Sequence, residues 1–310
     1  NIVDVYAGRN LQIFTDGSEF AVLTRPMTPA SIDITPQTSH GSLNVEVKDV
    51  DGATLFVDRN GKSLREYIYS FNEDAYVAQD KSVLASHLIK SPVDVAMLTG
   101  TASDDANWVF IVNSDGTASV LNTLRSQDIN GFTSWTTSGE IKTVSVVDDE
   151  LYMIVNRTLG GVESYFIERW DFDYRMDCAV KFTVGASVTG YSYLNGQEVS
   201  IVADNTVLPS RTVTGGEIVF TAQEQSAHTN GEAGLNFVPT IIPMPVTSNI
   251  GSGLNTMRIK RIVRMNIRVY ESYGIYINGL AVPIRNFGDA SVSPLDSNPE
   301  LESGIIEDVL

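Results

Sequence analysis

Several things that proteins use for special chemistry or anchoring are scarce in this chain. Cys178 is its single cysteine, so no disulfide can form within the chain. No window approaches the 18 consecutive apolar residues of a membrane-spanning helix, so we expect no membrane span. The sequence starts at Asn1 and shows no basic-then-apolar leader, which favours a fragment or a processed protein.

Histidine is also rare, and this bears on catalysis. His40, His87 and His228 lie far apart and lack metal-ligand spacing. Two acidic groups, Asp104-Asp105 and Asp148-Asp149-Glu150, lie in polar turns, where a solvated face is a better interpretation than a pair of glycosidase carboxylates. No glycine-rich loop has the form that binds phosphate. The sequence therefore predicts no catalytic residue, no cofactor and no metal site.

Basic residues are also few compared with acidic ones. Twenty-one basic residues face 38 acidic ones, which gives a net charge of −17 and argues against tight nucleic-acid binding. Most of the basic residues after position 255 fall in one stretch: Arg258, Lys260, Arg261, Arg264 and Arg268. Such a stretch is typical either of a strand with a solvated basic face or of a contact with an acidic neighbouring surface. We favour a subunit contact, because no aromatic residues alternate with the cations as in a nucleic-acid site.

Turn signals are abundant and separate short apolar or β-branched runs. Asn-Gly and Asp-Gly pairs supply the positive φ that tight hairpins require. They occur at Asp16-Gly17, Asp51-Gly52, Asn60-Gly61, Asp115-Gly116, Asn130-Gly131 and Asn195-Gly196. The sequence therefore predicts a mainly β fold.

The stretch 131–171 shows this pattern most clearly. A Ser138-Gly139 turn, the acidic turn at Asp148-Asp149 and a Gly160-Gly161 turn separate three or four short strands. Consecutive strands joined by such turns form an antiparallel meander, the unit of propellers and sandwiches. We expect propeller-like meanders over residues 1–173.

One stretch favours a helix instead. Asp80 is a candidate N-cap for a short helix near 80–89, with Val83, Leu84, His87 and Leu88 on one face, and Pro92 blocks its extension. On that face we expect His87 to be a partly buried, hydrogen-bonded side chain.

After residue 173 the expected strands become shorter. Shorter strands with glycine turns favour a small β-barrel or sandwich over 174–256. The prolines of 236–245 exclude a central strand there. Longer strands return over 257–310 and are expected to complete the β region, ending with a strand over 304–310.

Several blocks occur in an order that resembles a known family. LQIFTDGSEFAVL (11–23) is followed by LTRPMTPASIDITPQTSHGS (23–42), then by the block from Leu55 to Ile89 that begins LFVDRNGKSLRE. The meander from GFTSWTT to YFIERWD, GYSYLNGQEVSIVADN (190–205) and MRIKRIVRMNIRVYESYGIYING (257–279) complete the order. This order resembles the tail tubular protein B (nozzle) family of short-tailed phages. The family's proteins are much longer than this sequence, which lacks their N-terminal part.

The resemblance implies a structural protein of the phage tail, not an enzyme. Identical subunits, six in the family's usual arrangement, would form a ring around the channel through which DNA leaves. The ring would contact adjoining tail or portal-adaptor proteins, and double-stranded DNA would pass without specific binding. The protein would be made in the bacterial host cytoplasm and be located in the virion.

Two other functions stay open on the sequence alone. A surface-binding propeller, for carbohydrate or a receptor, would be favoured if Trp108, Trp135 and Trp170 clustered in solvent on one rim. A glycan-acting enzyme would need two carboxylates facing each other across a cleft.

Overall fold

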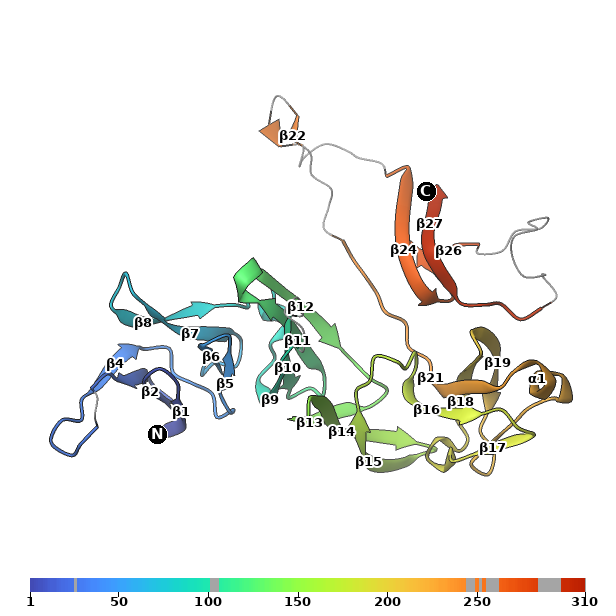
Figure 1. The fold of residues 1–310 in the computed structure, drawn as a ribbon, viewed down its shortest axis with the longest axis horizontal. Coiled ribbons are helices and arrows are strands. Elements are labelled where there is room, and N and C mark those ends of the chain that lie inside the picture. Colours follow the sequence, from blue (N-terminus) through green and yellow to red (C-terminus); the bar gives the residue numbers. More distant parts are fainter. Residues whose placement is uncertain are drawn as a thin grey trace. The chain divides into compact units, whose positions relative to one another are not determined.

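The computed structural model describes residues 1–24, 27–100, 106–243, 249–250, 253–254, 262–283 and 297–309 (Figure 1). The chain divides into two compact units, Asn1–Asp173 and Tyr174–Leu310. Antiparallel strands dominate both units, so the predicted mainly β class is confirmed. Within the described ranges no helix is long and apolar enough to cross a membrane.

Over its described residues the first unit contains four sheets, each built from strands that are consecutive in sequence. The first three sheets have four strands and the last has three. Their strands are β1 (Ile2–Ala7), β2 (Leu11–Thr15), β3 (Glu19–Val22) and β4 (Ile34–Thr38); β5 (Lys48–Val50), β6 (Ala53–Val57), β7 (Leu64–Ser70) and β8 (Ala75–Asp80); β9 (Pro92–Leu98), β10 (Asn107–Asn113), β11 (Ala118–Leu124) and β12 (Ile129–Trp135); and β13 (Glu140–Val147), β14 (Glu150–Leu159) and β15 (Val162–Arg169).

Several tight turns of these meanders are where the sequence predicts them, but the turn predicted at Asn130-Gly131 is wrong. Both residues lie inside β12, because the chain reverses earlier, at Arg125–Asp128, where Asp128 has the positive φ (53°). Asp51 and Gly52 both have positive φ (52° and 76°), as do Asp148 and Asp149 (51° and 61°). Gly160 and Gly161 join β14 to β15 in the same way, at 59° and 79°. Two consecutive positive φ values are the signature of the type I′ hairpin turn, whose twist matches that of the flanking strands.

Side chains alternate along the central strands, so each middle sheet is buried on both faces. On β6, Phe56 lies in a core shared with the first sheet, while Leu55 and Val57 lie in a core shared with the third. On β10, Val109 and Ile111 point into that second core, and Phe110 and Val112 into a core shared with the fourth sheet. The sheets therefore pack face to face in chain order, which is how propeller blades stack.

The second unit contains smaller sheets. A four-stranded sheet has the order β16 (Asp177–Thr183), β21 (Asn230–Leu235), β18 (Glu198–Ala203), β19 (Thr206–Thr212). The other pairs are β17 (Ser187–Thr189) with β20 (Glu217–Val219), β22 (Asn249–Ile250) with β23 (Gly253–Leu254), β24 (Arg264–Ser272) with β27 (Glu302–Val309), and β25 (Tyr276–Ile277) with β26 (Leu280–Ala281). Over the described part of 174–256 the sheets are open, so of the two predicted forms the barrel is wrong.

The helix predicted near 80–89 is also wrong. Asp80 ends β8, and only Ser86–Leu88 form one 3₁₀ turn, η1. The Ser82 hydroxyl accepts the backbone N–H of Leu64 (2.9 Å), which fixes the segment against β7. Ser82, Ala85 and Ile89 are the buried residues, whereas the expected apolar face is turned outward, with Leu84 95% exposed. Tertiary contacts, which local pattern does not contain, prevent the helix.

The remaining helical segments are short. The α-helix α1 (Ala222–Ala227) starts at a capping box formed by Thr221 and Glu224, and η2 (Arg125–Gln127) and η3 (Ser192–Leu194) are 3₁₀ turns. Near the C-terminal end, β27 starts at Glu302, close to the predicted final strand. That the strands of 257–310 complete the β region stays a prediction.

Candidate functional site

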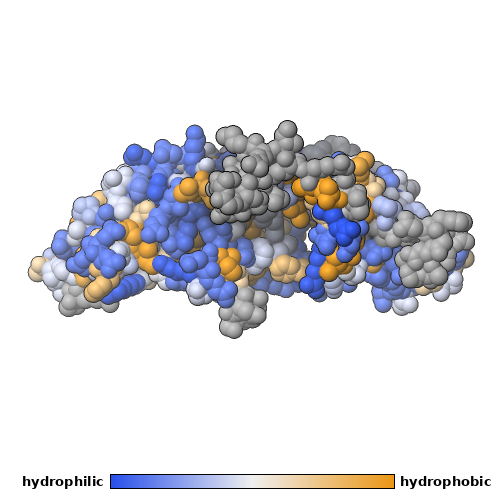
Figure 2. Space-filling model, turned by 90° about the horizontal axis from the view of Figure 1, so that it is seen from above, coloured by the Kyte–Doolittle hydropathy of each residue, from blue (hydrophilic) through white to orange (hydrophobic). Residues whose placement is uncertain are grey.

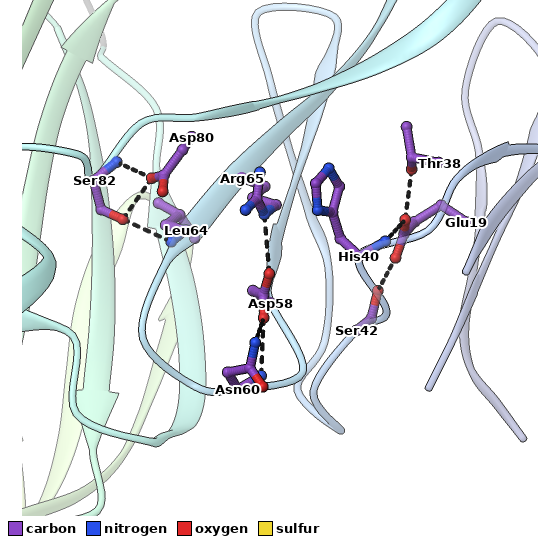
Figure 3. A network of polar contacts seen from close by, with 10 residues as sticks. All are labelled: Glu19, Thr38, His40, Ser42, Asp58, Asn60, Leu64, Arg65, Asp80 and Ser82. Carbon is purple, nitrogen blue, oxygen red and sulfur yellow. Dashed lines mark hydrogen bonds and ion pairs between the residues drawn. The ribbon is translucent and has the colours of Figure 1, made fainter. Parts of the chain in front are cut away.

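A buried carboxylate organises the polar network of the first unit. Glu19, at the start of β3, is fully buried. It accepts hydrogen bonds from the Thr38 hydroxyl (2.5 Å), the His40 backbone N–H (3.3 Å) and the Ser42 hydroxyl (3.4 Å) (Figure 3). Thus one side chain holds the whole turn that leaves β4. Burial, followed by the nearby charge of Glu19, raises the pKa of Tyr67.

Gly41 lies at the closest approach in this turn. Its φ is +75°, and a Cβ atom there would stand 2.5 Å from the Asp16 carbonyl oxygen. The Gly41 carbonyl in turn accepts the Arg59 N–H (2.9 Å), and Ser42 bridges Asp58 of the second sheet. The turn therefore ties the first two sheets together, and only glycine fits at its centre.

Two further clamps follow in the second sheet (Figure 3). The Asp58 carboxylate accepts the backbone and side-chain N–H groups of Asn60, each at 2.9 Å, and the Nε of Arg65 at 3.1 Å. The Asp80 carboxylate accepts the backbone N–H and the hydroxyl of Ser82, both at 2.8 Å. Each carboxylate thus closes a turn onto a neighbouring strand.

These three clamps lie in the segments that carry the family resemblance. Glu19, Thr38 and His40 come from the blocks at 11–42, and the Asp58 and Asp80 clamps come from the block at 55–89. Their polar atoms bond to backbone groups and to one another. That arrangement holds loops in place. Sequence reasoning missed Glu19, although its place in a resembling block was an available signal.

The histidines and turn carboxylates do not converge. His87 is exposed on η1, so the expectation that it is partly buried is wrong. His228 donates its backbone N–H to the Glu224 carbonyl at the end of α1 (2.9 Å). Asp148 and Asp149 form the hairpin turn described above, and Asp104-Asp105 lies outside the described residues.

The fourth sheet contains a buried ion pair on its inner face. Arg157 of β14 is only 1% exposed, and its Nε and Nη2 donate to the two Glu168 carboxylate oxygens, each at 2.6 Å. Nη1 donates to the Ser138 carbonyl (3.0 Å). The fork of a guanidinium matches a carboxylate in this two-point geometry. Arg157 therefore links β14, β15 and the turn before β13.

A groove of about 350 Å³ lies where three sheet edges meet within the first unit. It is lined by residues of β5, β9 and β13 and by the segment before β5, and it includes Glu46, Lys48, Asp49 and Asp94. Asp94 is already engaged, because its carboxylate accepts the Val144 N–H (3.0 Å) and the Thr143 hydroxyl. Lys48 is paired with Glu46 at 2.9 Å. Of the groove's charges, Asp94 thus joins β9 to β13, whereas Lys48 and Glu46 pair within one segment.

The three tryptophans do cluster, but around a core. Ring centroids of Trp135 and Trp170 are 5.0 Å apart, and those of Trp108 and Trp170 are 5.8 Å apart. All three indoles are half-buried against the core between the third and fourth sheets. Phe172, 4.0 Å from Trp170, is the member of this group that is largely in solvent, at 72% exposed.

Part of the predicted basic cluster is visible on β24. Arg264 and Arg268 alternate with half-buried apolar residues and are exposed, whereas Arg258, Lys260 and Arg261 lie outside the described residues. Arg264 is 3.9 Å from Glu307 of β27, with both side chains more than half in solvent. Such a pair contributes little to stability. The two arginines therefore lie in solvent on a two-stranded ribbon, where Arg264 is close to the exposed Glu307.

Two other described arginines of the second unit pair within it. Arg175 contacts Glu232 of β21 (3.3 Å) and Glu271 of β24, which ties the β24 ribbon to the four-stranded sheet. Arg211 pairs with Glu224. Burial would raise the pKa of the Glu224 carboxyl, but Arg211 and the Thr221 capping contacts outweigh it and lower that pKa to about 2.

No family model matches the chain, and no curated protein matches it.

Proposed function

We propose that the chain is a structural virion protein, a component of the nozzle of a short-tailed phage that forms a ring around the DNA-exit channel. The main support is that the clamps of Glu19, Asp58 and Asp80, the first two of them buried, lie in the segments that resemble the nozzle family. In a protein whose work is scaffolding, the residues that identify the family should be those that hold its sheets together.

The charge balance fits the same role. DNA must slide past the wall of an exit channel, and a basic wall would bind phosphates. With a net charge of −17, this chain repels the DNA backbone. Ring subunits of this kind would contact adjoining tail or portal-adaptor proteins and would need no catalytic residue or cofactor.

The exposed arginines of β24 supply a candidate subunit contact. Acidic residues dominate the rest of the chain, so Arg264 and Arg268 meet a complementary surface on a second copy. Charge reversal of Arg261 and Arg264 to Glu should weaken assembly, measured as mass in solution or as assembly into particles. Unchanged assembly would mean that the cluster is a solvated face.

Electron microscopy of the virion tests the main proposal. The chain should fit density at the distal end of the tail as a ring of identical subunits. If the protein is missing from the particle, the proposal fails.

One observation keeps a second function in view, recognition of carbohydrate or a receptor by an aromatic surface. Phe172 is largely exposed beside the tryptophan cluster, and exposed aromatic rings stack on sugar faces. Binding to a glycan array that is lost in a Phe172→Ala variant would favour it.

A further inference from the structure

The chain contains five Asn-Gly pairs, at 60–61, 130–131, 195–196, 230–231 and 278–279. In such a pair the backbone nitrogen of glycine can attack the side-chain amide carbon of asparagine, because glycine has no Cβ atom to hinder the approach. The ring that forms then opens with water, and asparagine becomes aspartate or isoaspartate. By sequence the five pairs are equal candidates for this reaction, but their surroundings in the fold differ.

Two of the pairs lie in turns that hold the attacking nitrogen. The Gly61 N–H donates to the Asp58 carbonyl (2.7 Å), and the Asn60 side-chain amide donates to the Asp58 carboxylate (2.9 Å). The Gly196 N–H donates to the Val213 carbonyl (2.9 Å). A nitrogen whose hydrogen is bonded within the fold has to break that bond before it reacts.

Two more pairs lie within paired strands. Asn130 and Gly131 belong to β12, and the Asn130 side-chain amide donates to the Lys81 carbonyl (3.0 Å). Asn230 and Gly231 belong to β21, the strand between β16 and β18 in its sheet. Pairing fixes the backbone of these residues, so closure of the ring requires local unfolding of the sheet.

The pair Asn278-Gly279 is the exception. It forms the exposed two-residue turn between β25 and β26, and both residues have positive φ, 50° and 82°. Within the described ranges, no hydrogen bond holds the Asn278 side chain or the Gly279 N–H. The strands on either side have only two residues each, anchored by the buried Ile277 and Val282. A turn of this kind opens at a low cost in free energy.

We propose that Asn278 is a site of spontaneous deamidation in the folded chain. The Gly279 nitrogen bonds to the Asn278 side-chain carbon, and ammonia leaves with the proton that the nitrogen loses, which gives a succinimide ring. Water then adds to either ring carbonyl, and the ring opens to aspartate or isoaspartate. Hydrophilic residues make up most of the coloured surface in Figure 2, and the exposed turns of such a surface are hydrated. The reaction therefore needs no reactant besides water.

The product changes both the charge and the shape of the hairpin. Each event turns a neutral amide into a carboxylate in a chain whose net charge is already −17. Isoaspartate also places one more methylene group in the backbone, so the two left-handed residues of a type I′ turn are lost. The pairing of Ile277 with Leu280 should loosen as a result.

The first test follows all five pairs in the folded chain. The protein is incubated in mildly alkaline buffer and sampled over time. Each sample is digested at acidic pH, and mass spectrometry detects the mass gained when NH₂ is replaced by OH. We expect the peptide that contains Asn278 to be modified roughly tenfold faster than any of the other four, since its turn opens most easily. Equal rates for Asn278 and the other four would overturn the proposal.

The control is the same chain unfolded in urea. All five pairs should then react at similar rates, because they share the same local sequence and the fold no longer protects four of them. If Asn278 reacts much faster than the others in urea as well, its neighbours in sequence set the rate, and the proposal fails.

An Asn278→Gln variant separates the reaction from its consequence. Glutamine would have to close a larger ring, which forms much more slowly. Amide hydrogen exchange over 275–282 should therefore rise with incubation time in the unaltered chain and stay constant in the variant. An equal rise in both would contradict the assignment of the change to Asn278. The chemistry requires only the fold and water, so these outcomes are independent of the nozzle role.

Discussion

Replacing Glu19 by alanine removes the one acceptor that holds the Thr38–Ser42 turn. Glu19 is fully buried, and three donors point at its carboxylate. Hydrogen bonds to a charged acceptor contribute about 1.5–3 kcal/mol each, and the 3.4 Å contact from Ser42 lies at the weak end. Relief of a buried charge offsets part of the loss. We expect the free energy of unfolding of the first unit to fall by about 3 kcal/mol.

The assay is favourable, because all three tryptophans lie in the first unit. Tryptophan fluorescence during urea titration therefore reports on the unfolding of that unit alone. Glu19→Gln keeps one acceptor oxygen but turns an NH₂ group toward the donors, and should lose about half as much. Glu73→Ala, at an exposed position, is the control and should change the free energy by less than about 0.5 kcal/mol. If Glu19→Ala behaves like the control, the clamp has no energetic role.

Three further predictions concern other parts of the chain. Arg157→Leu should lower the free energy of unfolding of the first unit by about 3–5 kcal/mol, because Glu168 loses its two-point partner in a buried ion pair. The control is Arg169→Leu at an exposed pair, which should cost less than about 1 kcal/mol. A loss that small for Arg157→Leu would contradict the prediction. Gly41→Ala should destabilise the first unit at least as much as Glu19→Ala, because the new Cβ atom would clash with the Asp16 carbonyl oxygen. An unchanged midpoint of urea unfolding would contradict this and show that the turn adapts. The Glu224 carboxyl should titrate near pH 2 when followed by NMR. Its contribution to stability is therefore complete above its ordinary pKa of 4.5 and is lost as the pH falls toward 2. A titration near pH 4.5 would exclude the pairing with Arg211.

Local chemistry accounts for the parts of the fold that sequence predicted well. The pairs Asp51-Gly52 and Gly160-Gly161 adopt positive φ because their own residue types favour it. The alternation of Arg264 and Arg268 with apolar residues likewise can be read from the strand's own sequence, without knowledge of the strand that pairs with it. Such features lie within a few residues of one another.

Long-range contacts account for what sequence did not predict. Asp80 and the residues after it satisfy a helix pattern, yet the bond from Leu64 to Ser82 joins segments 18 residues apart and prevents it. The donors of Glu19 follow it by 19 to 23 residues, so no spacing rule reveals the clamp. Arg157 finds Glu168 only through the register of β14 and β15.

Imaging of purified virions by electron cryomicroscopy tests the central claim most directly. The account predicts tail density at the DNA-exit end into which copies of this chain fit as a closed ring. Particles whose tails contain no copy of the chain, by density and by mass spectrometry, would contradict it.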